Sequence, residues 1–108
     1  MFNFFKKNYF IISMDEAKKN IEKDPSITII DVRTPAEYKS GHIPKAVNIP
    51  LDKIDQATGI IKKLDAPIYS YCLSGHRSKH ACNQLCKAGY TNVTHIGGIG
   101  SWSGPLKK

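Results

Sequence analysis

The chain has 108 residues, enough for one domain with a single core, and this length excludes a protein of several large domains. It is 41% hydrophobic and 23% charged, as ordinary globular proteins are, and its apolar runs are too short to span a membrane. The net charge of +7 favours anionic partners. Because the lysines are spread in pairs without interleaved aromatic residues, we expect neither nucleic acid nor a membrane as a partner.

Cysteine usage indicates the compartment. The chain has three cysteines, Cys72, Cys82 and Cys86, and no obvious secretory signal. An odd number of cysteines in such a chain fits reduced thiols, so the sequence predicts a cytoplasmic protein. We divide it into an N-terminal tail at residues 1–9 and a single domain at residues 10–108.

The first half of the chain alternates short strands with helices. The predicted elements are an edge strand at 10–12, a helix from Ser13 that stops before Asp24-Pro25, a strand at 27–30, a helix from Thr34 to about Ser40 stopped by Gly41, and a strand at 46–49. Each helix begins with a capping box, in which a hydroxyl and a glutamate satisfy free backbone N–H groups. Ser13 with Glu16 and Thr34 with Glu37 supply these pairs.

The second half continues the alternation. Its predicted elements are a helical stretch at 51–64 divided near Thr58-Gly59, a strand at 68–71, a helix that ends at Gly89, a strand at 93–96 broken by Gly97-Gly98, and a segment around Trp102 that caps the core. Alternating strands and helices predict an α/β fold with a central parallel sheet of about five strands and helices on both faces. The ligand site of such a sheet lies at the carboxyl ends of its strands.

Cys72 stands at one of these strand ends, immediately before a helix. The residues that follow it are poor core material but suit a small loop that holds an anion through backbone N–H groups. This loop comprises Leu73, Ser74, Gly75, His76, Arg77 and Ser78. The helix start and the Arg77 guanidinium favour a thiolate, so Cys72 is the candidate nucleophile. Gly75 permits the tight turn, and Ser74 and Ser78 are expected to donate hydroxyl hydrogen bonds.

The order and spacing of several motifs along the chain resemble the rhodanese-like family. The matching segments are IDVRTPAEY at 30–38, GHIP at 41–44, AVNIP at 46–50, YCLSGHRS at 71–78, GY at 89–90 and GGI at 97–99 with Trp102. Lys45 stands where the family commonly has glycine. The resemblance covers about residues 12–104 and implies a rhodanese-like fold of parallel strands flanked by helices.

The resemblance also implies sulfurtransferase chemistry. Cys72 would accept sulfane sulfur from a donor such as thiosulfate, hold it as a persulfide and pass it to cyanide or a thiol, as in two-step covalent catalysis. Arg77 would attract the anionic donor. The donor or acceptor in the cell is a small molecule or a sulfur-carrying protein, and no cofactor is required. His76 occupies a position that varies in the family, so we expect a role in substrate access.

Two other functions compete with sulfur transfer. Four residues separate Cys72 from Arg77, whereas related phosphatases have five to cradle a phosphate, so a phosphatase or arsenate reductase is disfavoured. The other alternative is a non-catalytic module that binds or regulates a partner. It is disfavoured because such a module need not keep the cysteine, the arginine and the loop together.

Asp31 and Arg33 end the strand beside the expected loop and are supporting candidates for the site. A structural role is the stronger hypothesis, with Arg33 paired to Glu37 four residues later and Asp31 accepting hydrogen bonds from its own loop. Cys82 and Cys86 lie four residues apart, too far for a disulfide on a helix, so we expect them to pack in the core. A role as a resolving thiol for Cys72 is the alternative.

No metal is expected, although Cys72, His76 and His80 have a suggestive spacing. An anion loop turns N–H groups toward its centre, and a fourth ligand is missing from the pattern. His42 and His95 are interpreted as structural histidines.

Overall fold

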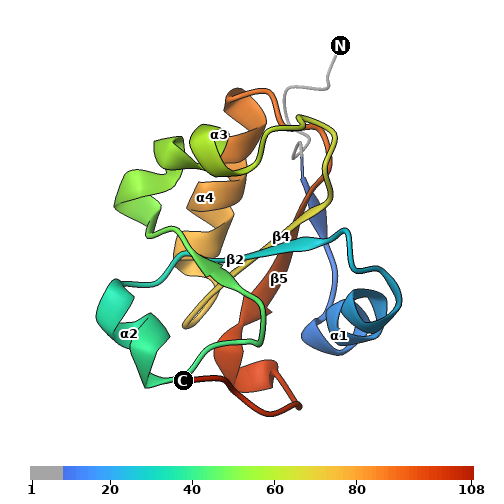
Figure 1. The fold of residues 1–108 in the computed structure, drawn as a ribbon, viewed down its shortest axis with the longest axis vertical. Coiled ribbons are helices and arrows are strands. Elements are labelled where there is room, and N and C mark those ends of the chain that lie inside the picture. The colour runs from blue at the N-terminus through green and yellow to red at the C-terminus, as the bar shows by residue number, and fades with distance from the viewer. Residues whose placement is uncertain (1–8) are drawn as a thin grey trace.

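The structure is a computed structural model that describes residues 9–108, and its centre is one sheet of five parallel strands (Figure 1). The strands are β1 (Phe10–Ile11), β2 (Thr28–Asp31), β3 (Val47–Asn48), β4 (Ile68–Cys72) and β5 (Val93–Gly98). Their spatial order is β1-β5-β4-β2-β3, and every neighbouring pair is parallel. The predicted parallel α/β fold is therefore confirmed, and β4, which carries Cys72, lies in the middle of the sheet.

Helices cover both faces of the sheet. They are α1 (Met14–Lys23), α2 (Pro35–Ser40), the 3-10 helix η2 (Leu51–Gln56), α3 (Ala57–Ile60), α4 (His76–Lys87) and the 3-10 helix η3 (Ile99–Ser101). Figure 1 shows α1 on the side of the sheet opposite to α3 and α4. None of the helices within residues 9–108 has the length and hydropathy needed to cross a membrane.

The core has two parts, one on each face of the sheet. The part under α4 contains Cys72 and Cys82, and the part under α1 contains Tyr71. Tyr71 and Cys72 are neighbours on β4 and point to opposite faces because side chains alternate along a strand. Trp102 packs against the α1 part, which confirms its predicted capping of the core.

Local sequence signals place the first two helices correctly. The Ser13 hydroxyl accepts a hydrogen bond from the Glu16 N–H at 3.1 Å at the start of α1. At the start of α2, Thr34 and Glu37 each accept a hydrogen bond from the other's backbone N–H, at distances of 2.9 and 3.2 Å. The capping box at α2 is confirmed in full, and at α1 the Ser13 half of the box is confirmed. These bonds satisfy N–H groups that have no partner within a helix.

The 51–64 stretch is divided, as expected, into η2 and α3, but the boundary before Ala57 precedes Thr58-Gly59. These two residues lie inside α3, and the backbone leaves helical geometry earlier, at Lys53, where φ is −123° and ψ is 20°. The helix then ends at Ile60, since Ile61 is extended and buried in the core. The predicted helical stretch to Leu64 is therefore wrong beyond Ile60.

The expected break of the last strand at Gly97-Gly98 is also wrong. Both glycines continue β5, and Gly98 pairs with Cys72 across the sheet. A shift in the β4–β5 register between Ser70 and Tyr71 precedes this pairing. The strand accommodates the glycines with a bulge, which is a common role for glycine in strands.

The predicted tail at residues 1–9 lies outside the described residues except for Tyr9. Tyr9 is buried in the part of the core under α4.

Candidate active site

Cys72 occupies the carboxyl end of β4, and its side chain is fully buried beneath the loop that follows. The Gly75 N–H donates a hydrogen bond to the Cys72 sulfur at 2.9 Å. Gly75 has a φ of +105°, a left-handed conformation that residues with a Cβ rarely adopt, and α4 begins directly after it. Glycine therefore allows the chain to turn its N–H back onto the sulfur at the positive end of a helix.

Gly98 on β5 lies against the backbone of Leu73 and Ser74 in this turn. A Cβ atom on Gly98 would be 2.5 Å from the Leu73 carbonyl oxygen and 3.3 Å from the Ser74 Cα. These neighbours are backbone atoms, which cannot move aside without moving the loop. The loop thus packs against β5 at a position where only glycine fits.

Three buried polar side chains connect α4 to the two central strands. Ser78 on α4 donates its hydroxyl hydrogen to the Ser70 hydroxyl at 2.9 Å, and the His95 ring nitrogen Nδ1 lies 2.9 Å from the Ser78 oxygen. Since the Ser78 hydrogen is used on Ser70, His95 Nδ1 is the donor in the second bond. Ser78 therefore donates a hydroxyl hydrogen bond, as expected from the sequence, and the acceptor is Ser70. His95 is structural, as predicted.

Arg77 forms an ion pair with Glu37 from α2. The two nitrogens at the end of the guanidinium bind the two carboxylate oxygens at 2.7 and 3.0 Å. The hydrogen bond from Arg77, together with that from the Thr34 N–H, lowers the pKa of Glu37 to about 2. The hydrogen bond to Glu37 and the nearby charges of Glu37 and Cys72 raise the pKa of Arg77.

This geometry predicts a pH-dependent contribution of Glu37 to stability. The pKa of Glu37 is about 2 in the folded chain, below its ordinary value of 4.5. The pair therefore stabilises the fold fully above pH 4.5, and this contribution is lost as the pH falls toward 2. Because both side chains are partly exposed, we expect it to be at most about 1 kcal/mol.

The measurement is urea unfolding of the wild type and of Glu37→Gln between pH 2 and 7. Glutamine preserves the capping box, so the comparison isolates the charge. The wild type should be more stable at neutral pH, and the difference should shrink as the pH approaches 2. A difference that is constant across this range would contradict the assignment.

Asp31 and Arg33 form a buried network with Tyr71. Two guanidinium nitrogens of Arg33 lie 2.7 to 3.1 Å from the Asp31 carboxylate, and the Tyr71 hydroxyl donates to Asp31 at 2.8 Å. Burial, together with Asp31, raises the pKa of Tyr71. The predicted pair of Arg33 with Glu37 is wrong, since each has a different partner. Asp31 does accept the expected loop hydrogen bond, from the Arg33 N–H at 2.9 Å.

The network lies on the α1 face of the sheet, with Tyr71, whereas the Cys72 side chain lies on the other face. The Tyr71 hydroxyl also accepts the Ile43 N–H at 3.1 Å, and Arg33 donates to the Gly41 carbonyl at 2.7 Å. These contacts hold the segment after α2 against the sheet. Asp31 and Arg33 thus have the structural role that the sequence favoured, one strand away from the thiol.

The other two cysteines pack in the core. Cys82 is fully buried, and this burial raises the pKa of its thiol to about 12. Cys86 is partly buried, and burial raises its pKa as well. Protonated thiols are weak nucleophiles, so the core-packing interpretation fits both residues. Within residues 9–108, no group of three or more His, Cys, Asp or Glu side chains is arranged to hold a metal ion.

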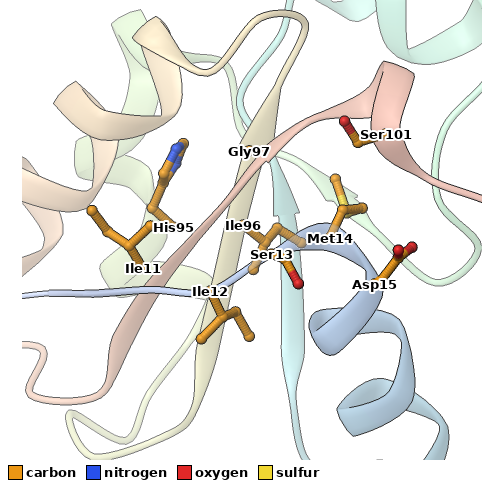
Figure 2. A pocket seen from close by; sticks show the side chains of 9 residues that line it. All are labelled: Ile11, Ile12, Ser13, Met14, Asp15, His95, Ile96, Gly97 and Ser101. Atoms are coloured by element: carbon orange, nitrogen blue, oxygen red, sulfur yellow. The ribbon is translucent and has the colours of Figure 1, made fainter.

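Two hollows lie near the elements of the site. One of about 390 Å³ is lined by the start of α1 and by β1 and β5, and Cys72 is not part of its lining. Figure 2 shows the His95 ring there pointing away from Ser13 and Asp15. The other, of about 410 Å³, is lined by Arg77 together with Val32, Thr34, Pro50, Leu51, Asp52 and Gln84. Cys72 lines neither hollow, and of the two only the second is lined by a residue of the Cys72 loop, Arg77.

Comparison with known proteins identifies the family. The sequence model of the family, described as the rhodanese-like domain, matches residues 13–105 of this chain. The chain belongs to the rhodanese-like family. It is 39% identical over 72 residues to the thiosulfate sulfurtransferase PspE of Escherichia coli, a match that covers 65% of this chain and 68% of PspE. The crystal structure of a rhodanese-like domain protein from Staphylococcus aureus has a TM-score of 0.80 and 31% identity, covering 91% of this chain and 96% of that one.

Some relatives are longer than the region they share with this chain. YrkF of Bacillus subtilis is 35% identical over 94 residues, which are 86% of this chain but half of YrkF. Among the relatives in this family, PspE carries the name of a thiosulfate sulfurtransferase.

Sequence reasoning missed two residues beside the loop. Glu37 was assigned only to the capping box and to Arg33, although a glutamate that is already fixed at a helix start is well placed to receive a distant arginine. Gly98 was interpreted as a strand break. The available signal was that glycine inside a strand often marks a close approach of backbone.

Proposed function

We propose that this rhodanese-like chain is a cytoplasmic sulfurtransferase that carries sulfane sulfur on Cys72 as a persulfide. The observation that carries the proposal is the 2.9 Å hydrogen bond from the Gly75 N–H to the Cys72 sulfur. It lies at the start of a twelve-residue helix, where negative charge is favoured. Residues 73–75 and the first turn of α4, residues 76–78, form the anion-binding loop, to which Arg77 belongs.

In the first half-reaction, the Cys72 thiolate attacks the outer sulfur of a donor such as thiosulfate. A bond forms between the two sulfurs, the bond to the sulfite group breaks, and sulfite leaves with its electron pair. The products are sulfite and an anionic persulfide on Cys72, so the total charge is unchanged. The Gly75 N–H and the α4 start stabilise the charge on sulfur.

In the second half-reaction, a nucleophile attacks the outer sulfur of the persulfide and displaces the Cys72 thiolate. Cyanide yields thiocyanate, and a thiolate yields a new persulfide on the acceptor. The name of PspE supports thiosulfate as a donor. Small thiols or a sulfur-carrying protein serve equally as acceptors under this chemistry. Three cysteines that form no disulfide with one another fit the reducing cytoplasm.

The test is the intact mass of the protein after exposure to thiosulfate. We expect a gain of one sulfur atom that dithiothreitol reverses, and no gain in Cys72→Ser because an alcohol cannot form a persulfide. Cys86→Ser is the matched control and should gain sulfur as the wild type does. If neither thiosulfate nor inorganic polysulfide adds sulfur, or if Cys72→Ser gains it equally, the proposal fails and a non-catalytic module becomes the better interpretation.

A further inference from the structure

In their ion pair, the Glu37 carboxylate neutralises the positive charge of Arg77, the residue expected to bind an anionic donor. We propose that Glu37 is a specificity-determining residue, which lowers the reactivity of Cys72 toward negatively charged donors relative to donors of little charge. The inference rests on the proposed sulfur transfer for its biological meaning. The physical effect on Cys72 is measurable without any turnover.

The first argument concerns the guanidinium. Both terminal nitrogens of Arg77 are engaged by Glu37, at 2.7 and 3.0 Å. This is the paired fork geometry with which arginine also binds oxyanions. A sulfonate group that enters the hollow lined by Arg77 must therefore compete with a carboxylate that is already bound there.

The second argument concerns the carboxylate, which is fixed from its own side. Its oxygen Oε1 accepts the Thr34 N–H at 2.9 Å, so the start of α2 holds it in place. The pKa of Glu37 is about 2, so the residue stays ionised near neutral pH. The competing charge is consequently permanent, and the pair presents no net charge to an incoming donor.

Alkylation of Cys72 by iodoacetate and iodoacetamide tests this directly. The two reagents share a leaving group and a similar size but differ by one negative charge, and peptide mass spectrometry isolates the modification of Cys72. The quantity measured is the ratio of the iodoacetate rate to the iodoacetamide rate. In Glu37→Gln this ratio should rise about fivefold, as expected for removing one nearby negative charge.

The matched control is Glu22→Gln. Glu22 pairs with Lys18 on the exposed side of α1, at 2.9 Å, and is equally a glutamate in an ion pair. Its substitution should leave the ratio unchanged. An unchanged ratio in Glu37→Gln would overturn the proposal. A lower ratio would do so as well, because it would mean that Glu37 holds Arg77 in position for anions.

A double substitution separates charge from geometry. Arg77→Ala leaves the Glu37 charge uncompensated and should lower the alkylation ratio about fivefold. Adding Glu37→Gln to Arg77→Ala removes that charge and should return the ratio close to the wild-type value. A double variant that stays as low as Arg77→Ala would contradict an electrostatic origin.

Sulfur transfer supplies the second readout. With thiosulfate as donor and cyanide as acceptor, Glu37→Gln should raise kcat/KM about fivefold through a lower KM, while Glu22→Gln should match the wild type. If the wild type transfers no sulfur, the proposed function fails, yet the alkylation ratios still decide whether Glu37 repels anions from Cys72. The two failures are thus distinguishable.

Discussion

Replacing Asp31 with alanine is expected to lower the free energy of unfolding by about 3 to 5 kcal/mol. The carboxylate is fully buried and accepts hydrogen bonds from Arg33 and Tyr71. Its removal leaves the buried Arg33 guanidinium without its counter-charge and the Tyr71 hydroxyl without its acceptor. An uncompensated buried charge costs far more than a lost surface contact.

Urea unfolding followed by the fluorescence of Trp102, the only tryptophan, measures the loss. Glu22→Ala breaks an exposed pair and should cost less than about 1 kcal/mol. The combination of Asp31→Leu with Arg33→Met removes both charges and should be more stable than Asp31→Ala. A cost for Asp31→Ala as small as that for Glu22→Ala would show that the buried pair is not a main support of the fold.

Replacing Gly98 with alanine is expected to reduce sulfur transfer about a hundredfold, the typical effect of moving reacting groups by about an ångström. The added methyl group would lie 2.5 Å from the Leu73 carbonyl oxygen, so the loop must shift. The shift moves the Gly75 N–H relative to the Cys72 sulfur. Overpacking of this kind also costs about 1 to 3 kcal/mol of stability.

The activity is measured as thiocyanate formed from thiosulfate and cyanide, and circular dichroism verifies that the variant is folded. Gly100→Ala is the matched control, because a Cβ on Gly100 would meet nothing within 4 Å apart from its chain neighbours. It should retain the wild-type rate. Wild-type activity in a folded Gly98→Ala protein would mean that the loop tolerates displacement. The close contact between the loop and Gly98 would then be unimportant for the chemistry.

Features that depend on neighbouring residues were predictable from the sequence. The hydroxyl and carboxylate of a capping box lie within one helical turn, so the start of α2 follows from Thr34 and Glu37 alone. The strand that carries Cys72 follows from a short apolar run before a polar loop. The parallel sheet then follows from the alternation of strands and helices.

Features that depend on tertiary pairing were not predictable in this way. Arg77 and Glu37 are 40 residues apart, and nothing local to either residue determines that they meet. The sequence offered Arg33 as a nearer partner for Glu37, but the folded strand end turns Arg33 toward Asp31. The contact of Gly98 with the loop likewise requires the β4–β5 register, and a glycine within a strand does not by itself tell which segment approaches it.

The alternation of side chains along β4 places the buried ion-pair network and the reactive thiol on opposite faces of the sheet. Tyr71 belongs to the layer that contains the Asp31 and Arg33 network, and Cys72, its immediate neighbour, belongs to the layer under α4. Substitutions in the first layer should change how well the protein tolerates heat or urea, whereas those in the second should also change what Cys72 reacts with. A designer can therefore stabilise this domain from its α1 side without replacing residues in the layer of Cys72.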